Sequence, residues 1–209
     1  MKPAQSLLTP DNHTLVLIDF EGQMAFATNS HSMQELRQNT GLISGGSKVF
    51  GVPTIVTTVG EHHFAGPVFP EILEYYPKEE YEYIDRTSMN TWEDEAAYNA
   101  IIQPGKKKIV MAGLWTSVCI VYPALSAIEE GYEVYVIADA CGDVTMEAHN
   151  RAMERMVQAG VQPVTSVQYV LELQRDWARP TGGAVSRLMK KYAGTYGIGM
   201  QYAEGMLRH

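Results

Sequence analysis

Cysteine and positive charge are both scarce in this sequence. Its 209 residues include two cysteines, Cys119 and Cys141, which are too few for the disulfide framework of a small secreted protein. The sequence therefore indicates a reducing compartment. Sixteen Lys and Arg stand against 24 Asp and Glu, which gives a formal net charge of −8. That balance argues against electrostatic binding to nucleic acid or to an anionic membrane.

Long hydrophobic runs are also missing. The longest mostly apolar stretch, Ile109 to Leu125, is interrupted by two hydroxyl residues and a proline. It is shorter than the roughly 20 residues that a membrane-spanning helix needs. The first dozen residues lack the apolar segment of a signal peptide. Because 45% of the residues are apolar, the chain can bury a core, and we expect a soluble, cytoplasmic protein.

Motifs that bind phosphate groups or activate a serine are absent. There is no Walker A sequence and no Gly-x-Ser-x-Gly elbow. The glycine-rich segment 41–46 neither follows a strand directly nor opens a helix, so it is not a dinucleotide-binding fingerprint. We therefore expect no cofactor.

Short runs of β-branched and aliphatic residues alternate with longer segments of helical period, which is typical of a parallel α/β sheet. Each run is apolar enough for a strand that is covered on both faces. The expected strands are 14–19, 54–58, 81–84, 108–112, 133–138 and 161–166, and the expected helices are 33–50, 93–102, 116–130, 146–159 and a stretch from 167 onward, with a short helix near Pro70.

Two segments depart from this regular pattern. The helix 33–50 contains three glycines within 41–46, and we expect it to be broken there. After residue 180 the chain is rich in Tyr, Met and Gly and has no strand signal. We expect one domain over 1–180 and a C-terminal helical arm over 181–209. The apolar side chains of the arm predict contacts with a neighbouring subunit, and a frayed tail is the alternative.

Candidate functional residues gather where the predicted strands end. Ligands of open parallel sheets bind beyond the carboxyl ends of the strands. Asp19, Arg86 and Cys119 are expected at that edge, together with the loop Glu61-His62-His63. A carboxylate, a guanidinium and a thiol at one edge form the outline of a nucleophile site.

Cys119 is the candidate nucleophile. If Thr116 caps the following helix, Cys119 lies in its first turn, where free N–H groups and the helix dipole lower a thiol pKa and favour the thiolate. The alternative is a buried, inert cysteine, which is the common state of a free thiol and our interpretation of Cys141. Pro123 lies where the helix interior should be, so it predicts either a kinked helix or an irregular first turn.

Asp19 and Arg86 each have a functional and a structural interpretation. Asp19 can take the thiol proton and return it to a leaving amine, or it can cap a turn after its strand. Arg86 can keep Asp19 and Cys119 charged by proximity, or it can form a weak surface salt bridge with Asp85 or a nearby glutamate. Arg86 cannot transfer a proton, because a guanidinium stays protonated.

The Glu61-His62-His63 loop raises a metal hypothesis. Imidazole and carboxylate ligands together suit zinc, iron or manganese. Adjacent residues seldom bind one ion together, and a real site needs a larger ligand set. We therefore expect no metal at these residues.

Several motifs together resemble the isochorismatase-like cysteine hydrolase superfamily. They are Leu17-Ile-Asp19, Ile84-Asp-Arg86 and Ala112-Gly-Leu-Trp-Thr-Ser-Val-Cys119, supported by Asp139-Ala140 and Gln158-Ala-Gly160, and the resemblance spans about residues 10–175. Two further segments, 123–131 and 172–177, are similar to its bacterial, YcaC-type branch. The resemblance implies a three-layer α/β/α, Rossmann-like fold with a six-stranded parallel sheet. For the YcaC-type branch it implies a homo-octamer.

The resemblance also implies a set of site residues. The aspartate, lysine and cysteine of the family map onto Asp19, Arg86 and Cys119, with an arginine in place of the lysine. A cis peptide bond between Leu114 and Trp115 is implied, as is an oxyanion hole formed by the N–H groups of Trp115 and Cys119. The glutamate-histidine loop differs in spacing from the Asp-x-His pattern of metal-using nicotinamidases.

Together these features predict a cysteine hydrolase that cleaves a C–N bond of a small amide-like or carbamoyl compound through a thioester. We expect Phe20, Glu21, Trp92, Trp115 and the His62-His63 loop to shape the pocket for this small molecule. One alternative is a metal-assisted, nicotinamidase-like amidase. The other is a non-catalytic oligomer that binds a small ligand.

Overall fold

The computed structural model describes residues 4–207, so residues 1–3 and the last two residues of the predicted arm lie outside the described residues. Its centre is a parallel sheet of six strands in the order β3-β2-β1-β4-β5-β6. The predicted fold class is therefore confirmed. The strands are β1 (His13–Ile18), β2 (Thr54–Val59), β3 (Ile84–Arg86), β4 (Lys108–Leu114), β5 (Glu133–Gly142) and β6 (Gln162–Val164).

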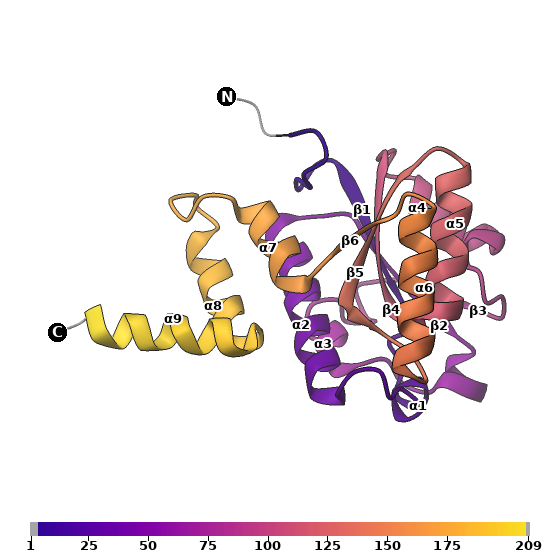
Figure 1. Cartoon of the computed structure of the whole chain (residues 1–209), viewed down its shortest axis with the longest axis horizontal. Helices are drawn as coiled ribbons and strands as arrows, with labels where there is room; N and C mark the ends of the chain where they lie inside the picture. Colours follow the sequence, from indigo (N-terminus) through magenta and orange to yellow (C-terminus); the bar gives the residue numbers. More distant parts are fainter. Residues whose placement is uncertain (1–3, 208–209) are drawn as a thin grey trace.

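Helices cover both faces of the sheet (Figure 1). On one face lie α2 (Met33–Phe50), α3 (Pro70–Leu73) and α7 (Ser166–Gln174). On the other lie α4 (Glu95–Ile102), α5 (Val121–Glu129) and α6 (Met146–Gln158). The short elements are α1 (Gly22–Phe26), the π-helical turns η1 (Glu61–Ala65) and η3 (Thr116–Ile120), and the 3-10 turn η2 (Thr91–Glu93). Within residues 4–207, no helix is both long and apolar enough to cross a membrane.

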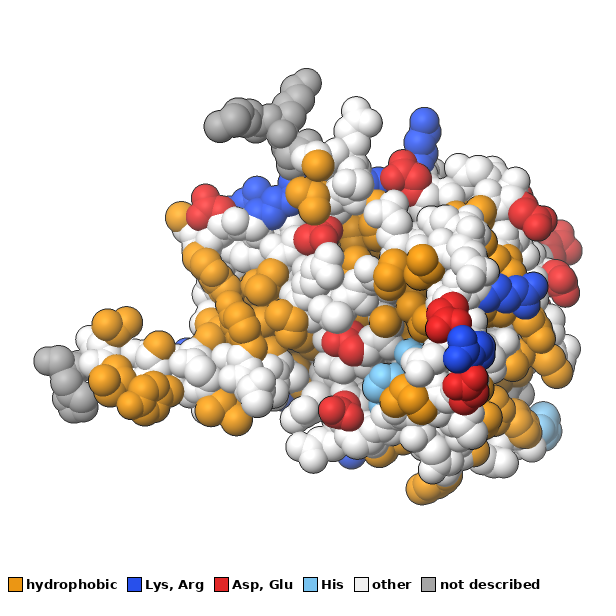
Figure 2. All heavy atoms as spheres, viewed as in Figure 1, with side chains coloured by type: hydrophobic (Ala, Val, Ile, Leu, Met, Phe, Trp, Pro, Cys, Tyr) orange, Lys and Arg blue, Asp and Glu red, His pale blue; other side chains and the backbone are white. Residues whose placement is uncertain are grey.

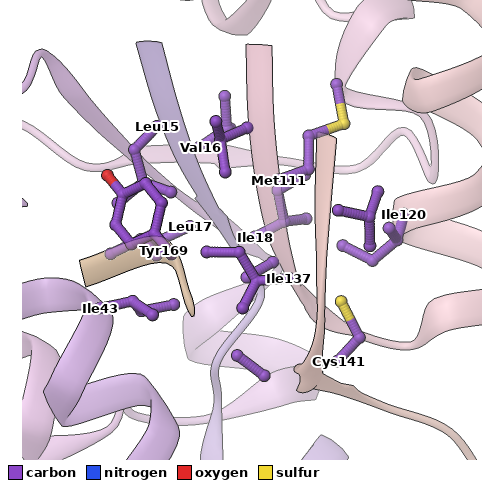
Figure 3. Close-up of a cluster of buried hydrophobic side chains, with 14 of the residues drawn as sticks. Leu15, Val16, Leu17, Ile18, Ile43, Met111, Ile120, Ile137, Cys141 and Tyr169 are labelled. Carbon is purple, nitrogen blue, oxygen red and sulfur yellow. The ribbon is translucent and has the colours of Figure 1, made fainter. Parts of the chain in front are cut away.

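The core lies on both sides of the central strands. Every residue of β1 is buried, as expected for a parallel strand between two helical layers. Figure 3 shows Ile43 and Tyr169 packed on one side of the sheet and Ile120 on the other. Cys141 is fully buried within β5, in agreement with its structural interpretation.

The order of the strands places a crevice at the centre of the sheet. From β1 the chain builds outward through β2 and β3, and it then returns to the other side of β1 to build β4, β5 and β6. Strand order therefore reverses between β1 and β4, which is the point where open α/β sheets bind their ligands. Asp19 follows β1 and Cys119 follows β4, so the sequence already placed both on this crevice.

Helix α2 is continuous, and the expectation that its glycines break it is wrong. Gly41, Gly45 and Gly46 instead allow other helices to approach closely. A Cβ on Gly41 would lie 2.5 Å from a ring carbon of Tyr192, and one on Gly46 would lie 2.7 Å from a methyl group of Val170. The lost helix propensity is therefore offset by tight packing of the C-terminal helices on α2.

The bounds of all six predicted strands shift by at least one residue in the structure, and those of β3 and β5 shift most. Residues 81–83 do not belong to β3, because pairing with β2 begins at Ile84. Tyr81 packs on the ring of Tyr76, and the Tyr83 hydroxyl donates to the Tyr76 carbonyl. Both side chains thus contact Tyr76, and neither residue pairs with β2. Strand β5 extends to Gly142, four residues beyond its expected end, so Asp139 lies inside it.

The C-terminal segment consists of α8 (Gly182–Tyr192) and α9 (Gly194–Leu207). Helix α8 packs against α2 and buries Val185, Leu188 and Met189. Helix α9 extends away from the body of the molecule (Figure 1), and Figure 2 shows hydrophobic side chains along this projection. The segment is thus helical throughout its described length, with one half packed on its own chain and the other projecting.

The packing of α8 on α2 predicts the effect of Gly41→Ala. The added methyl group would collide with the ring of Tyr192, whose hydroxyl donates to Glu74 at 2.7 Å and limits its movement. We expect the free energy of unfolding to fall by about 1–3 kcal/mol, although alanine is the better helix former. Denaturant unfolding measures the change.

Gly183→Ala in α8 is the matched control. Gly183 is exposed, and an added Cβ would meet no atom closer than the Arg187 side chain at 3.7 Å. This variant should be as stable as the parent or more stable by up to about 1 kcal/mol. Equal effects of the two substitutions would contradict the packing explanation.

Candidate active site

Cys119 lies at the crevice, in the turn η3 between β4 and α5. The residue is 5% exposed and borders a cavity of about 460 Å³. The irregular helix start predicted from Pro123 is confirmed, because η3 is a π-helical turn and the α-helix begins only at Val121. The sulfur is therefore buried, but it faces a space that can hold a small molecule.

A buried ion pair lies beside Cys119. Arg86 Nη2 donates to Asp19 Oδ2 at 2.5 Å, and both side chains are 0% exposed. Strands β1 and β3 are two strand spacings apart, or about 10 Å, so the long guanidinium side chain reaches Asp19 across β2. Thr57 of β2 donates its hydroxyl to Asp19 Oδ1 at 3.4 Å. The interpretation of Arg86 as a surface salt-bridge partner of Asp85 is therefore wrong.

The backbone of Asp19 adopts a left-handed conformation, with φ of 55°. Aspartate is one of the few residues besides glycine that tolerate this region, and strained backbone is found preferentially at functional sites. The conformation ends β1 and aims the carboxylate into the crevice. The alternative role of Asp19 as an ordinary cap of the next turn does not describe this site, because its carboxylate is paired with Arg86.

Burial and pairing set the protonation of the site. Burial raises the pKa of Asp19 to about 6, although Arg86 and a hydrogen bond from Cys119 oppose the rise. Burial and the adjacent Asp19 carboxylate raise the pKa of the Cys119 thiol to about 12. At neutral pH the carboxylate is therefore ionised and accepts a hydrogen bond from the neutral thiol. The predicted thiolate at a helix N-terminus is wrong, since burial outweighs any helix-dipole effect.

Thr116 does not cap α5 either. Its hydroxyl donates to the Gly142 carbonyl at 3.1 Å and lies 2.9 Å from Nδ1 of His149. Asp143 caps the turn η3 instead, since its Oδ2 accepts from the Ser117 N–H at 2.6 Å. Sequence reasoning missed Asp143 and His149. The position of Asp143, directly after β5 and level with the end of β4, was the available signal.

The start of the nucleophile turn also has the backbone geometry that the resemblance implied. The peptide bond between Leu114 and Trp115 is cis. The N–H of Trp115 is directed at the Cys119 sulfur. One residue earlier, a Cβ on Gly113 would overlap the Ile18 carbonyl oxygen, so glycine is required for β4 to lie this close to β1. That contact brings Asp19 and Cys119 together.

Apolar side chains form most of the cavity wall. Phe64 comes from η1 and Val118 from η3, while Met89 comes from the loop after β3. The residues that line the cavity are Met24, Val59, Gly60, His63, Phe64, Arg86, Thr87, Met89, Trp115, Val118 and Cys119.

Of the residues expected to shape the pocket, Trp115 and His63 line the cavity, whereas four others do not. Phe20 packs against Phe69 in the core. Trp92 packs between Tyr98 and Tyr132 and donates its indole N–H to Glu130, away from the site. His62 is exposed on η1, where the adjacent His63 faces the cavity instead.

Glu21 is the fourth of these residues, and it is buried behind the site. Its Oε2 accepts from the Val59 N–H at 3.0 Å, and its Oε1 has no hydrogen-bond partner. Burial and the nearby carboxylates, Asp19 among them, raise the pKa of Glu21 to about 8. The side chain is therefore protonated at neutral pH and does not add a second negative charge beside Asp19.

The metal hypothesis has no ligand set among residues 4–207. No three His, Cys, Asp or Glu side chains gather there in a way that could hold an ion. The Glu61 carboxylate is paired with Lys78, and its backbone N–H donates to Asp85. These residues do not fit the site of a metal-assisted amidase.

A thiol, a carboxylate and a guanidinium meet at the switch point of a parallel sheet, which is the arrangement of an α/β enzyme with a nucleophile site. The chain belongs to the isochorismatase family, because the model of the Isochorismatase domain matches residues 13–168. The resemblance noted from the motifs is thereby confirmed, and the protein is a hydrolase of this family. The alternative of a non-catalytic binding protein is set aside.

Similar proteins from two bacteria support this assignment. The probable hydrolase YcaC of Escherichia coli K12 is 33% identical over 177 residues, which is 84% of each chain. The crystal structure of the E. coli YcaC gene product, an octameric hydrolase of unknown specificity, matches with a TM-score of 0.90 and 31% identity over 99% of this chain and 100% of that one. YcaC from Pseudomonas aeruginosa, solved with hexane-2,5-diol and covalent acrylamide, matches with a TM-score of 0.89 and 28% identity over 97% and 100%.

The protonated Glu21 predicts how stability depends on pH. In the folded protein the Glu21 carboxyl keeps its proton up to a pKa of about 8, whereas in the unfolded chain it releases the proton near the ordinary glutamate pKa of 4.5. Between these values Glu21 contributes a fall in the free energy of unfolding as pH rises, of at most about 1.4 kcal/mol per pH unit. Below about pH 6.5 the buried His13 and His149, whose pKa values burial lowers to about 4, contribute in the opposite direction. Above about pH 6.5 the contribution of Glu21 remains, and we expect Glu21→Gln to remove this fall, as measured by urea unfolding between about pH 6.5 and about pH 8.

Glu79→Gln is the control, because it makes the same substitution at an exposed glutamate. Its pH dependence should follow that of the parent protein. If Glu21→Gln and Glu79→Gln gave the same slope, Glu21 would not be the buried proton carrier described above.

Proposed function

We propose that this hydrolase cleaves the C–N bond of a small amide-like or carbamoyl compound through a thioester on Cys119. The observation that carries the proposal is the contact of the Cys119 thiol with the ionised Asp19 carboxylate at the border of the cavity. A carboxylate that already accepts the thiol hydrogen bond is placed to remove that proton as the sulfur attacks. No metal or cofactor enters the mechanism.

The first half of the reaction forms the acyl-enzyme. The sulfur attacks the substrate carbonyl carbon, the C–S bond forms, and the thiol proton moves to Asp19. The carbonyl electron pair moves to oxygen, and the N–H groups of Trp115 and Cys119 stabilise that oxyanion; one such donor is worth about 10²–10³ in rate. When the intermediate collapses, the C–N bond breaks and Asp19 gives its proton to the leaving nitrogen.

The second half regenerates the thiol. Asp19, ionised again, takes a proton from water while the water oxygen attacks the thioester carbonyl. The C–S bond then breaks, the acid product leaves, and the proton on Asp19 returns to the sulfur. Arg86 stays protonated throughout and compensates the negative charge that passes between carboxylate and sulfur. The arginine thus supplies the charge of the family lysine without a transferable proton.

A covalent adduct in one relative supports the nucleophile of this proposal. The P. aeruginosa YcaC structure contains covalent acrylamide, which is itself a small amide. That protein aligns with this chain over its whole length, at 28% identity. A covalent bond to such a molecule requires a nucleophilic group in that protein. In this chain Cys119 is the nucleophile that borders the cavity.

We further propose that the protein is a homo-oligomer, an octamer like E. coli YcaC, with α9 in the contact between subunits. The projecting helix carries apolar side chains that its own chain leaves uncovered. Ile198 is 65% exposed, Tyr202 71% and Leu207 87%. Such a continuous apolar surface is typical of a subunit contact. We therefore assign the subunit contact of the expected arm to α9 alone, since α8 is packed on α2 of its own chain.

Cys119→Ala tests the proposed chemistry. Removing the sulfur leaves no atom to form the thioester, so hydrolysis of any accepted amide should fall by at least about 10³-fold. Intact-protein mass spectrometry of the parent, quenched during turnover, should show an added acyl mass that the variant lacks. Cys141→Ala is the matched control, because this second buried cysteine lies within β5 and does not line the cavity. Normal turnover by Cys119→Ala would refute the mechanism.

Ile198→Asp tests the assembly. A carboxylate placed on the uncovered face of α9 would have to be buried in a subunit contact without a partner, so we expect a mass well below that of the parent in light scattering. Gln158→Asp, at the exposed end of α6, adds the same charge elsewhere and should leave the mass unchanged. A parent protein that is already monomeric would remove the proposal.

A further inference from the structure

The cavity next to Cys119 has an apolar wall built by four separate segments of the chain. Met24 comes from α1, Phe64 from η1, Met89 from the loop after β3 and Val118 from η3. With about 460 Å³, the cavity is large enough for a small organic molecule rather than for a water or an ion alone. The part of the substrate that fills it must therefore make its contacts with hydrocarbon and sulfur.

Few polar groups of the wall are open to a ligand deep in the cavity. Arg86 is the only Lys or Arg among the lining residues, and its charge is paired with Asp19 through Nη2 while Nη1 donates to the Ser88 carbonyl. Its Nε has no partner but is enclosed by protein. The Trp115 indole N–H donates to Thr28 at 3.0 Å.

The remaining polar side chains of the wall, His63 and Thr87, belong to residues that are exposed to solvent. They can meet a polar group near the entrance, but they do not create a buried site for an anion. A carboxylate carried into the cavity would lose its water without gaining a paired cation, which is strongly unfavourable. The wall thus selects against charge on the acyl group.

We propose that the enzyme takes amides of apolar, uncharged carboxylic acids, with the hydrocarbon part of the acyl group in this cavity. The proposal rests on the thioester chemistry proposed above and adds the class of substrate. Amides whose acyl group carries a carboxylate are poor substrates, because the cavity wall offers no unpaired Lys or Arg to compensate that charge. Each methylene that moves from water into the cavity should raise kcat/KM about fourfold until the cavity is full.

A substrate series tests this selectivity on the parent protein. We expect kcat/KM to rise from acetamide through butanamide to hexanamide. The monoamide of adipic acid has the same six-carbon chain with a carboxylate at its end, and its kcat/KM should be at least about 100-fold below that of hexanamide. Equal or faster hydrolysis of the charged amide would overturn the proposal.

Met89→Arg provides a gain-of-function test. Met89 is 62% exposed at the cavity wall and takes no part in the proposed mechanism, so a guanidinium there can reach the entrance without burial. We expect this variant to raise kcat/KM for the adipic monoamide at least about tenfold relative to parent. Met89→Gln is the control of similar size without charge, and it should leave the charged amide a poor substrate. A failure of arginine to outperform glutamine would count against the proposal.

Binding separates this inference from the proposed chemistry. Calorimetry on Cys119→Ala should show tighter binding of hexanamide than of the adipic monoamide, whether or not any amide is hydrolysed. If the parent hydrolyses none of the amides while this preference holds, the thioester proposal fails and the apolar pocket stands. If amides are hydrolysed but binding shows no preference for the uncharged chain, the substrate class is wrong and the chemistry stands.

Discussion

The buried ion pair between Asp19 and Arg86 is the constraint on which the site depends. Two charges with no exposed side-chain surface must compensate each other, because breaking such a pair costs about 3–5 kcal/mol. The pair fixes the carboxylate at the end of β1 and connects it to β3 across β2. It also influences the protonation of Cys119, since the paired carboxylate accepts the hydrogen bond of its thiol.

The turn η3, which carries Cys119, is also held by hydrogen bonds on the side away from Asp19. Asp143 accepts from the Ser117 N–H, and Thr116 connects the turn to Gly142 and His149. Burial lowers the pKa of His149 to about 4, so the imidazole is neutral and adds no charge near the site. The position of Cys119 is therefore fixed by contacts on both sides, as a pre-organised nucleophile requires.

The sequence predicted what depends on strand order and strand ends. Six apolar runs identify the sheet, and the rule for strand ends places Asp19, Arg86 and Cys119 at one edge from the sequence alone. The cavity wall was harder to predict, because Phe64 and Met89 come from irregular segments without a hydrophobic period. The glycines of α2 led to the wrong prediction of a broken helix. The close approach of Tyr192 that they allow is a tertiary contact, which no local sequence pattern reveals.

The protonation of Cys119 could not be predicted from its position after a strand, and it changes how the site works. A helix N-terminus lowers a thiol pKa only where the sulfur keeps some solvent, whereas here burial and the Asp19 carboxylate raise it to about 12. A thiol of this kind is a weak nucleophile until its proton leaves. In the proposed mechanism the proton leaves during the attack on a carbonyl, when the negative charge passes from Asp19 through sulfur to an oxygen held by N–H groups. The site would then keep one negative charge beside Arg86 at every stage, and a reactive thiolate would never stand free in the resting protein.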